Sequence, residues 1–180
     1  MTQTLTSKGV APLDDNGRTV TSLGYWLSKS VTLSGNNTTV VTPIFTIAGT
    51  VQILGIWGVV TTALGANHTA AAWRLNDQTA QVDITLNTGT ALSGAAAGSV
   101  IVKKGLAAAA LTLLTSAAGR VSEPTTLETQ YFSPFVAVKK SGATTQIEYV
   151  YATTDTPTSG VIQFFVSWLP VSADGMVSVA

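Results

Sequence analysis

The stretch Pro43 to Thr62 constrains the fold more than any other part of this chain. It contains no charged residue and is rich in β-branched and aromatic side chains, a composition that favours strands. Alternation places Phe45 and Ile47 on one face of a first strand. A tight turn at Ala48-Gly49-Thr50 leads into a second strand that begins at Val51. We therefore expect a hairpin of two buried strands, which needs cover on both of its apolar faces.

The alternation in the second strand slips by one residue at Gly55. Before this glycine, Val51 and Ile53 share a face, whereas after it Ile56 and Val60 take over that face. A glycine lets a strand kink and reset its register, because it has no Cβ. The sequence therefore predicts a β-bulge at Gly55.

Further segments repeat the two-residue alternation. They are 68–76 and 80–86, separated by a turn at Asp77-Gln78, then 100–102, 131–138, 146–153 and 161–169. Pro134 marks an edge or a bend in its strand, and Pro170 ends the last one. Leu106 to Leu114 has the composition of a helix, although its leucines do not form a helical stripe. Eight or nine short strands with at most one helix predict an all-β, jelly-roll-like antiparallel β-sandwich.

The first 38 residues are polar and rich in turn signals, so we expect an extended N-terminal arm at 1–38 and a sandwich domain at 39–180. Tyr25, Trp26 and Leu27 interrupt the arm. Such a cluster is either an anchor that docks on a protein surface or a short strand at the edge of the same domain. The sequence leaves both interpretations open.

The composition bounds the function. A chain of 180 residues fits one domain, and only 10% of its residues are charged, with a formal net charge of zero. A monomer with this low content of charged residues would associate readily. We therefore expect partners to cover much of its surface. Neutrality argues against nucleic acid as a partner. The chain has no cysteine, which excludes disulfides, and we expect neither a secretory signal nor a transmembrane helix.

Groups that could perform catalysis are scarce. The single histidine, His68, lies in an apparent turn without a nucleophile motif nearby, so we interpret it as a solvated turn residue. Asp77 and Asp83 lie on adjacent expected strands, but a glycosidase pair would also need a cleft. The segment Asp14–Gly17 resembles a calcium loop without its bidentate glutamate. We therefore expect no enzyme activity, no catalytic, cofactor or metal site, and no small-molecule substrate.

Two basic pairs, Lys103-Lys104 and Lys139-Lys140, each lie beside a glycine-containing turn. They are either solvated loop tips or contacts for an acidic surface on a partner.

Two blocks of the sequence resemble a known family. PIFTIAG at 43–49 with VQI at 51–53 and IWGVVTT at 56–62, and GVIQFFVSWLPVS at 160–172, are similar to the opening and closing strands of head-decoration (cement) proteins of tailed bacteriophages. The resemblance implies a jelly-roll-like virion protein, made in the host cytoplasm, that sits as a homotrimer on the capsid exterior over junctions between major capsid subunits. The segment 91–119 has no counterpart in this comparison.

The resemblance suggests which residues make contacts. Candidates for contact with the capsid or a neighbouring subunit are Tyr25, Trp26, Leu27, Lys103, Lys104, Lys139 and Lys140. Deleting Met1 to Leu27 is then expected to abolish capsid binding and leave a folded oligomer.

Two other functions stay open: a phage tail or fibre component, and a carbohydrate-binding module. The latter would use exposed tryptophans as stacking platforms. We expect Trp26 and Trp73 to be these platforms, because Trp57 and Trp168 lie in apolar strands and are expected to be buried.

Overall fold

The computed structural model describes residues 24–35, 38–88, 92–103, 111–114, 134–153 and 159–180. These residues form strands and no helix, which confirms the all-β class. The strands are β1 (Tyr25–Thr32), β2 (Thr39–Ala48), β3 (Thr50–Thr62), β4 (His68–Asn76), β5 (Gln81–Asp83), β6 (Val100–Lys103), β7 (Leu111–Leu114), β8 (Phe135–Val138), β9 (Thr145–Thr153), β10 (Val161–Pro170) and β11 (Met176–Val179).

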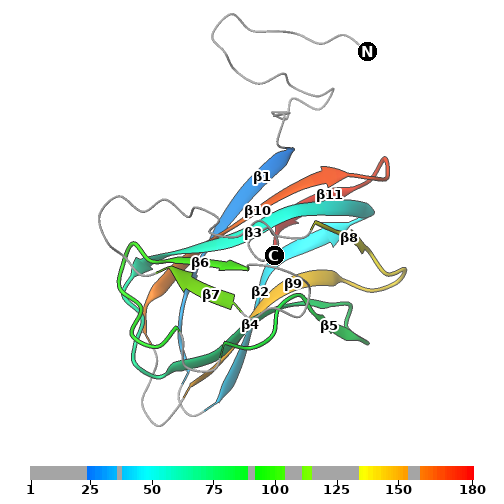
Figure 1. The fold of residues 1–180 in the computed structure, drawn as a ribbon. Coiled ribbons are helices and arrows are strands. Elements are labelled where there is room, and N and C mark those ends of the chain that lie inside the picture. Colours follow the sequence, from blue (N-terminus) through cyan, green and yellow to red (C-terminus); the bar gives the residue numbers. More distant parts are fainter. Residues whose placement is uncertain (1–23, 36–37, 89–91, 104–110, 115–133, 154–158) are drawn as a thin grey trace, which may run out of the picture.

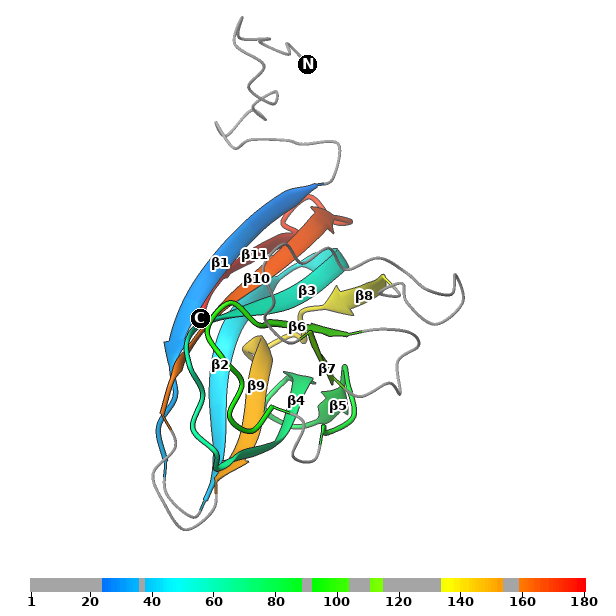
Figure 2. The ribbon, with the colours of Figure 1, turned by 60° about the vertical axis from the view of Figure 1, so that its left-hand side comes forward.

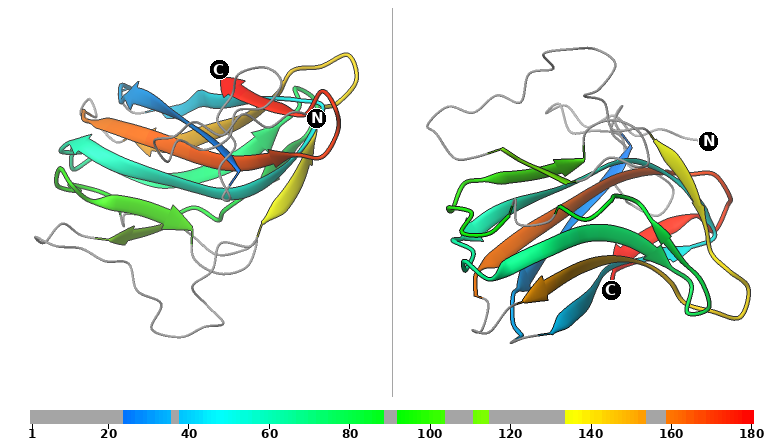
Figure 3. Two further views of the ribbon diagram at one scale, coloured as in Figure 1. Left: turned by 90° about the horizontal axis from the view of Figure 1, so that it is seen from above. Right: turned by 60° about the horizontal axis from the view of Figure 1, so that its bottom comes forward.

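The strands build two antiparallel sheets packed face to face (Figure 1). The six-stranded sheet has the order β1-β10-β3-β6-β7, with β8 also paired to β3, and the five-stranded sheet has the order β11-β2-β9-β4-β5. The paths β1-β10-β3-β6 and β2-β9-β4-β5 face each other, as in a jelly roll. Figures 2 and 3 show the two layers from other sides. The predicted jelly-roll-like sandwich is therefore confirmed.

The expected hairpin at 43–62 is wrong, although both of its strands exist. β2 and β3 lie in opposite sheets, and the chain crosses between them at Gly49, whose φ is +56°. β2 pairs with β11 and β9, and β3 pairs with β10, β6 and β8. The alternation of apolar and polar residues shows which faces of a strand are buried. It does not show which strand pairs with it, so the same pattern fits a hairpin and a turn that crosses between two sheets.

The predicted bulge in β3 is confirmed. Ser167 pairs with Gly55 and Trp168 pairs with Ile53, which leaves Leu54 as the extra residue. On either side of this bulge Ile53 and Ile56 both point into the core, with 0% and 3% of their surface exposed. The bulge thus keeps one apolar face inward along the whole strand.

Aromatic side chains join the two sheets at the centre of the core. Phe164 of β10 lies opposite Gly58 of β3, where a Cβ would come within 3.2 Å of the phenylalanine ring. The ring meets Trp73 of β4 edge-on, with a centroid distance of 6.4 Å, and Tyr149 of β9 at 4.8 Å. Each such contact contributes about 0.5–1.5 kcal/mol beyond area burial.

Three other expectations need correction. Tyr25 begins β1, which pairs with β10 along its length, so the boundary expected at residue 38 falls inside the sandwich. Leu111–Leu114 is a strand and not part of a helix, and 104–110 lie outside the described residues. The expected strand at 80–86 is shorter: β5 ends at Asp83, and Val82 is exposed. β8, which follows Pro134, is a strand, and in the described part of the chain it pairs with β3.

Candidate interaction surface

An uncharged patch with apolar and aromatic side chains lies on the outer face of the six-stranded sheet, beside polar residues such as Gln163 and Ser167. Alternation turns one set of side chains of β1, β3 and β10 away from the core. We call this patch the aromatic face; it comprises Trp26, Leu54, Trp57, Val59, Phe165 and Leu169.

A stacked pair lies at the centre of the aromatic face. Trp57 and Phe165 are direct cross-strand partners, and their rings are nearly parallel, with centroids 5.4 Å apart and an interplanar angle of 5°. A Cβ at Gly55 would lie 3.7 Å from the indole of Trp57, so the tryptophan ring lies beside the bulge. Neighbouring strands hold both rings in place, which makes them a rigid contact surface.

The rim of the aromatic face is more exposed than its centre. Trp26, on β1, lies beside Ser167 of β10 and exposes 62% of its surface, and Leu169 exposes 36%. At the outward positions of β1, β3, β8 and β10 there is no charged residue. An exposed, uncharged face with aromatic anchors is typical of a protein–protein interface.

Of the three predicted contact residues in β1, only Trp26 faces outward. Tyr25 stacks on the buried Trp168 with ring centroids 4.7 Å apart, and Leu27 packs against the core. The cluster is thus the edge strand that the sequence left as one of two interpretations. Because deleting residues through Leu27 would remove core contacts, the expectation that this deletion leaves a folded product no longer follows.

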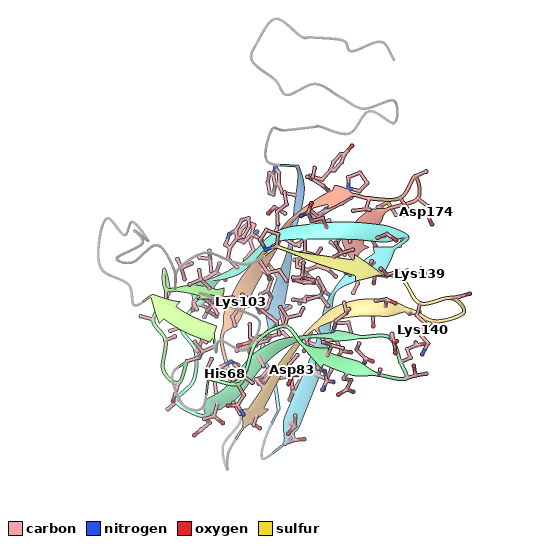
Figure 4. All side chains as sticks on the ribbon, turned by 45° about the vertical axis from the view of Figure 1, so that its right-hand side comes forward. His68, Asp83, Lys103, Lys139, Lys140 and Asp174 are labelled. Carbon is pink, nitrogen blue, oxygen red and sulfur yellow. The ribbon has the colours of Figure 1, made fainter. Side chains whose placement is uncertain are left out.

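The four predicted lysines do not form one site. Lys103 is buried, Lys104 lies outside the described residues, and Lys139 and Lys140 are exposed. Figure 4 shows Lys139 and Lys140 at the same end of the molecule as Asp174, away from Lys103. Lys140 Nζ lies 3.5 Å from Asp77 Oδ2, an exposed pair whose contribution to stability is small.

The interpretation of His68 as a solvated turn residue is wrong. It is the first residue of β4 and is fully buried, with its ring against Tyr149 and Tyr151. Nε2 lies 2.6 Å from the hydroxyl oxygen of Tyr149, and Nδ1 has no hydrogen-bond partner among the described residues. Burial lowers the pKa of His68 to about 4. No local pattern around His68 indicated this burial, since both tyrosines lie far along the chain in β9.

On the outer face of the five-stranded sheet, polar side chains of β4 and β9 pair with one another. Arg74 Nε donates to Glu148 Oε2 at 2.6 Å, and Asn76 Nδ2 donates to Glu148 Oε1 at 2.8 Å. Arg74 also donates to Gln81 Oε1 at 2.9 Å. Glu148, which is 3% exposed, is therefore satisfied within the chain.

The two aspartates considered as a glycosidase pair have different surroundings. The backbone amides of Thr79 and Ala80 donate to Asp77 Oδ1, and these bonds lower the pKa of its carboxyl group to about 2. Asp83 lies opposite Arg74 in β4. Asp77 therefore holds its own turn, and no contact joins the two carboxylates in the described structure.

The remaining expectations concern metals, membranes and sugars. Within the described ranges, no three His, Asp or Glu side chains gather as metal ligands, and no helix could span a membrane. The segment Asp14–Gly17 lies outside these ranges. Trp73, expected to be an exposed platform, is fully buried, whereas Trp57 lies on the aromatic face.

No family model, curated protein or solved structure matches this chain.

Proposed function

We propose that this chain is a structural virion protein that decorates the outside of a tailed-bacteriophage capsid and stabilises the assembled shell. The observation that carries the proposal is the aromatic face, whose outward positions are free of charge over several strands. A surface of this kind is best covered by another protein chain. Because 43–62 and 160–172 resemble cement proteins, we propose the major capsid protein as the chain that covers the aromatic face.

The aromatic face is suited to a contact that must hold without a large conformational change. Trp57 and Phe165 are fixed by strands on both sides, so they lose little conformational freedom on binding. A tryptophan and a phenylalanine in the centre of an interface are typical hot-spot residues. Trp26 and Leu169 then lie at the rim, where water has access.

Stabilisation follows from mass action. A protein that binds only the assembled shell lowers its free energy by about 2.7 kcal/mol per site when its free concentration is 100 times Kd. Many identical sites multiply this effect over the shell. Assembly of the chain into a homotrimer adds avidity, because three linked contacts dissociate more slowly than one.

The test uses capsids of the phage that encodes the chain, prepared without it. The purified chain is added to these capsids and to separated tails, and the bound fraction is measured by sedimentation. Saturable binding to capsids, together with a higher melting temperature of the shell, is the expected result. Native mass spectrometry of the free protein is expected to show a trimer.

Two outcomes would overturn the proposal. Binding to tails in place of capsids would identify a tail or fibre component. Binding to a glycan array at millimolar affinity or better, with no capsid binding, would identify a carbohydrate-binding module that uses Trp26 and Trp57 as its platforms.

A further inference from the structure

β1 is the longest strand at a sheet edge in the described structure. It pairs with β10 through all 8 of its residues, and no described strand pairs with its other side (Figure 2). We call this other side the outer edge of β1. The strands at the other ends of the two sheets, β5, β7 and β11, have only 3 or 4 residues. A long strand with one unpaired edge is a template for strand addition by another chain.

Lys29 is the one charged residue in β1, β10 and β3, which lie side by side in the six-stranded sheet. Alternation places its side chain on the inner side of β1, together with Leu27 and Val31. Leu27 packs against the core, and Val31 is buried. A cation therefore occupies an inward position in an otherwise apolar series.

The ammonium group of Lys29 connects the edges of the two sheets. Nζ donates to the carbonyl oxygen of Pro43 in β2 at 2.8 Å and to that of Ala180, which follows β11, at 2.7 Å. β2 and β11 both belong to the five-stranded sheet. An ammonium group has three N–H donors, and the bond to Ala180 is exposed. The charge of Lys29 therefore keeps contact with water at this side of the sandwich.

We propose that Lys29 prevents a second copy of the chain from adding its own β1 to the outer edge of β1. An added strand would cover the side of the sandwich at which the ammonium group meets water, and dehydration of a charge is costly. Inward-pointing charged residues are a known protection of sheet edges against such pairing.

The position of Lys29 along β1 makes this protection specific for a second copy. Lys29 is near the middle of the strand. In a symmetric antiparallel pair of β1 strands centred there, the two Lys29 side chains would lie close together. Like charges on neighbouring strands destabilise the pair. β1 carries no other charge that could have this effect.

The test compares variants of the full chain without capsids, so its result does not depend on the proposed function. Lys29→Met removes the charge and keeps most of the aliphatic stem, and Lys29→Gln removes the charge and keeps an N–H donor. Size-exclusion chromatography with light scattering measures the mass as the protein concentration is raised. Both variants are expected to associate beyond the mass of the unmodified chain at a concentration at least tenfold lower.

Two further variants serve as controls. Lys139→Met makes the same change of net charge at an exposed position that follows β8, far from Pro43 and Ala180 in sequence. Lys29→Arg keeps a cation with several donors at the position itself. Both controls are expected to keep the mass of the unmodified chain.

Hydrogen exchange distinguishes strand addition from aggregation of unfolded chains. In assemblies of the two uncharged Lys29 variants, backbone amides on the outer edge of β1 should exchange at least tenfold more slowly, because they bond to the added strand. Thermal unfolding checks that the variants are folded at the temperature of the measurement.

A measurement on the unmodified chain covers the case in which neither uncharged variant folds. A synthetic peptide with the sequence of 25–32 should leave exchange at the outer edge of β1 unchanged, and slower exchange would overturn the inference. It is equally overturned if both uncharged variants keep the mass of the unmodified chain, if Lys139→Met associates as strongly, or if the assemblies show no added protection in β1.

Discussion

The two outer faces of the sandwich differ in how their outward side chains are paired. On the five-stranded sheet, Glu148 is enclosed by hydrogen bonds from Arg74 and Asn76, so the polar groups of that face find their partners within the chain. On the six-stranded sheet, Trp57 and Phe165 stack on each other and present an uncharged surface. The polar cluster of the first face is paired within the chain, whereas the aromatic pair of the second gains from being covered.

Because the two faces differ, substitutions can change the stability of the fold and the affinity for the capsid separately. Substitutions on the polar face should change the free energy of unfolding, because they break internal pairs. Substitutions on the aromatic face should change the affinity for the shell more than the stability of the fold. Variants on the polar face therefore serve as controls for the binding role of the aromatic face, and variants on the aromatic face serve as controls for the stabilising role of the polar face.

The largest effect is expected for the double substitution of Trp57→Ala and Phe165→Ala. Removing two central aromatic anchors should weaken capsid binding about a thousandfold, or ~4 kcal/mol. Co-sedimentation with capsids measures the loss, and thermal unfolding checks the fold. Val41→Ala, an exposed valine of β2, is the matched control.

A second variant tests the same surface in case the double substitution prevents folding. Gln163→Lys places a charge at an outward, polar position of β10 and should weaken binding at least tenfold. Unchanged binding of both variants would show that the aromatic face is not the contact surface.

Acid should destabilise the fold through the inner side of the five-stranded sheet. The pKa of His68 is lowered from 6.5 to about 4, so the unfolded chain binds a proton in this window and the native chain does not. The free energy of unfolding should therefore fall by roughly 3 kcal/mol as the pH falls from 6.5 to 4. Denaturant unfolding at several pH values measures it. If His68→Gln, which stays neutral, shows the same slope, the histidine is not responsible.

Breaking the polar face should have a smaller effect. Glu148→Ala leaves Arg74 and Asn76 without their carboxylate partner and should lower the free energy of unfolding by about 2 kcal/mol. Glu148→Gln keeps the shape and one acceptor and should cost less. Both variants should bind capsids normally once folded; a loss of capsid affinity in either would contradict the assignment of the two faces.

The smallest effect is expected at the rim of the aromatic face. Trp26 is 62% exposed, so Trp26→Ala should weaken capsid binding by up to tenfold, about 1.4 kcal/mol. Its melting temperature should change little, in contrast to Tyr25→Ala, which removes a ring stacked on Trp168. A loss as large as that of the central pair would move the centre of the interface toward β1.

The candidate site was only partly predictable. Trp26 was found because two aromatics stood out in a polar segment, but Trp57 was expected to be buried, since it lies in an apolar strand. Alternation tells which residues share a face and not which face is the core. The inward position of Lys103 was likewise hidden, because a lysine at a strand end resembles a solvated loop tip.

The all-β class, most strands and the bulge at Gly55 could be predicted from the sequence, because they depend on periodicity and on the missing Cβ of glycine, which are local properties. The placement of β2 and β3 in opposite sheets and the burial of His68 against Tyr149 could be seen only in the folded chain. Both facts depend on strands that are distant in sequence. Such pairings follow from how the whole chain covers its apolar surface, which no local pattern records.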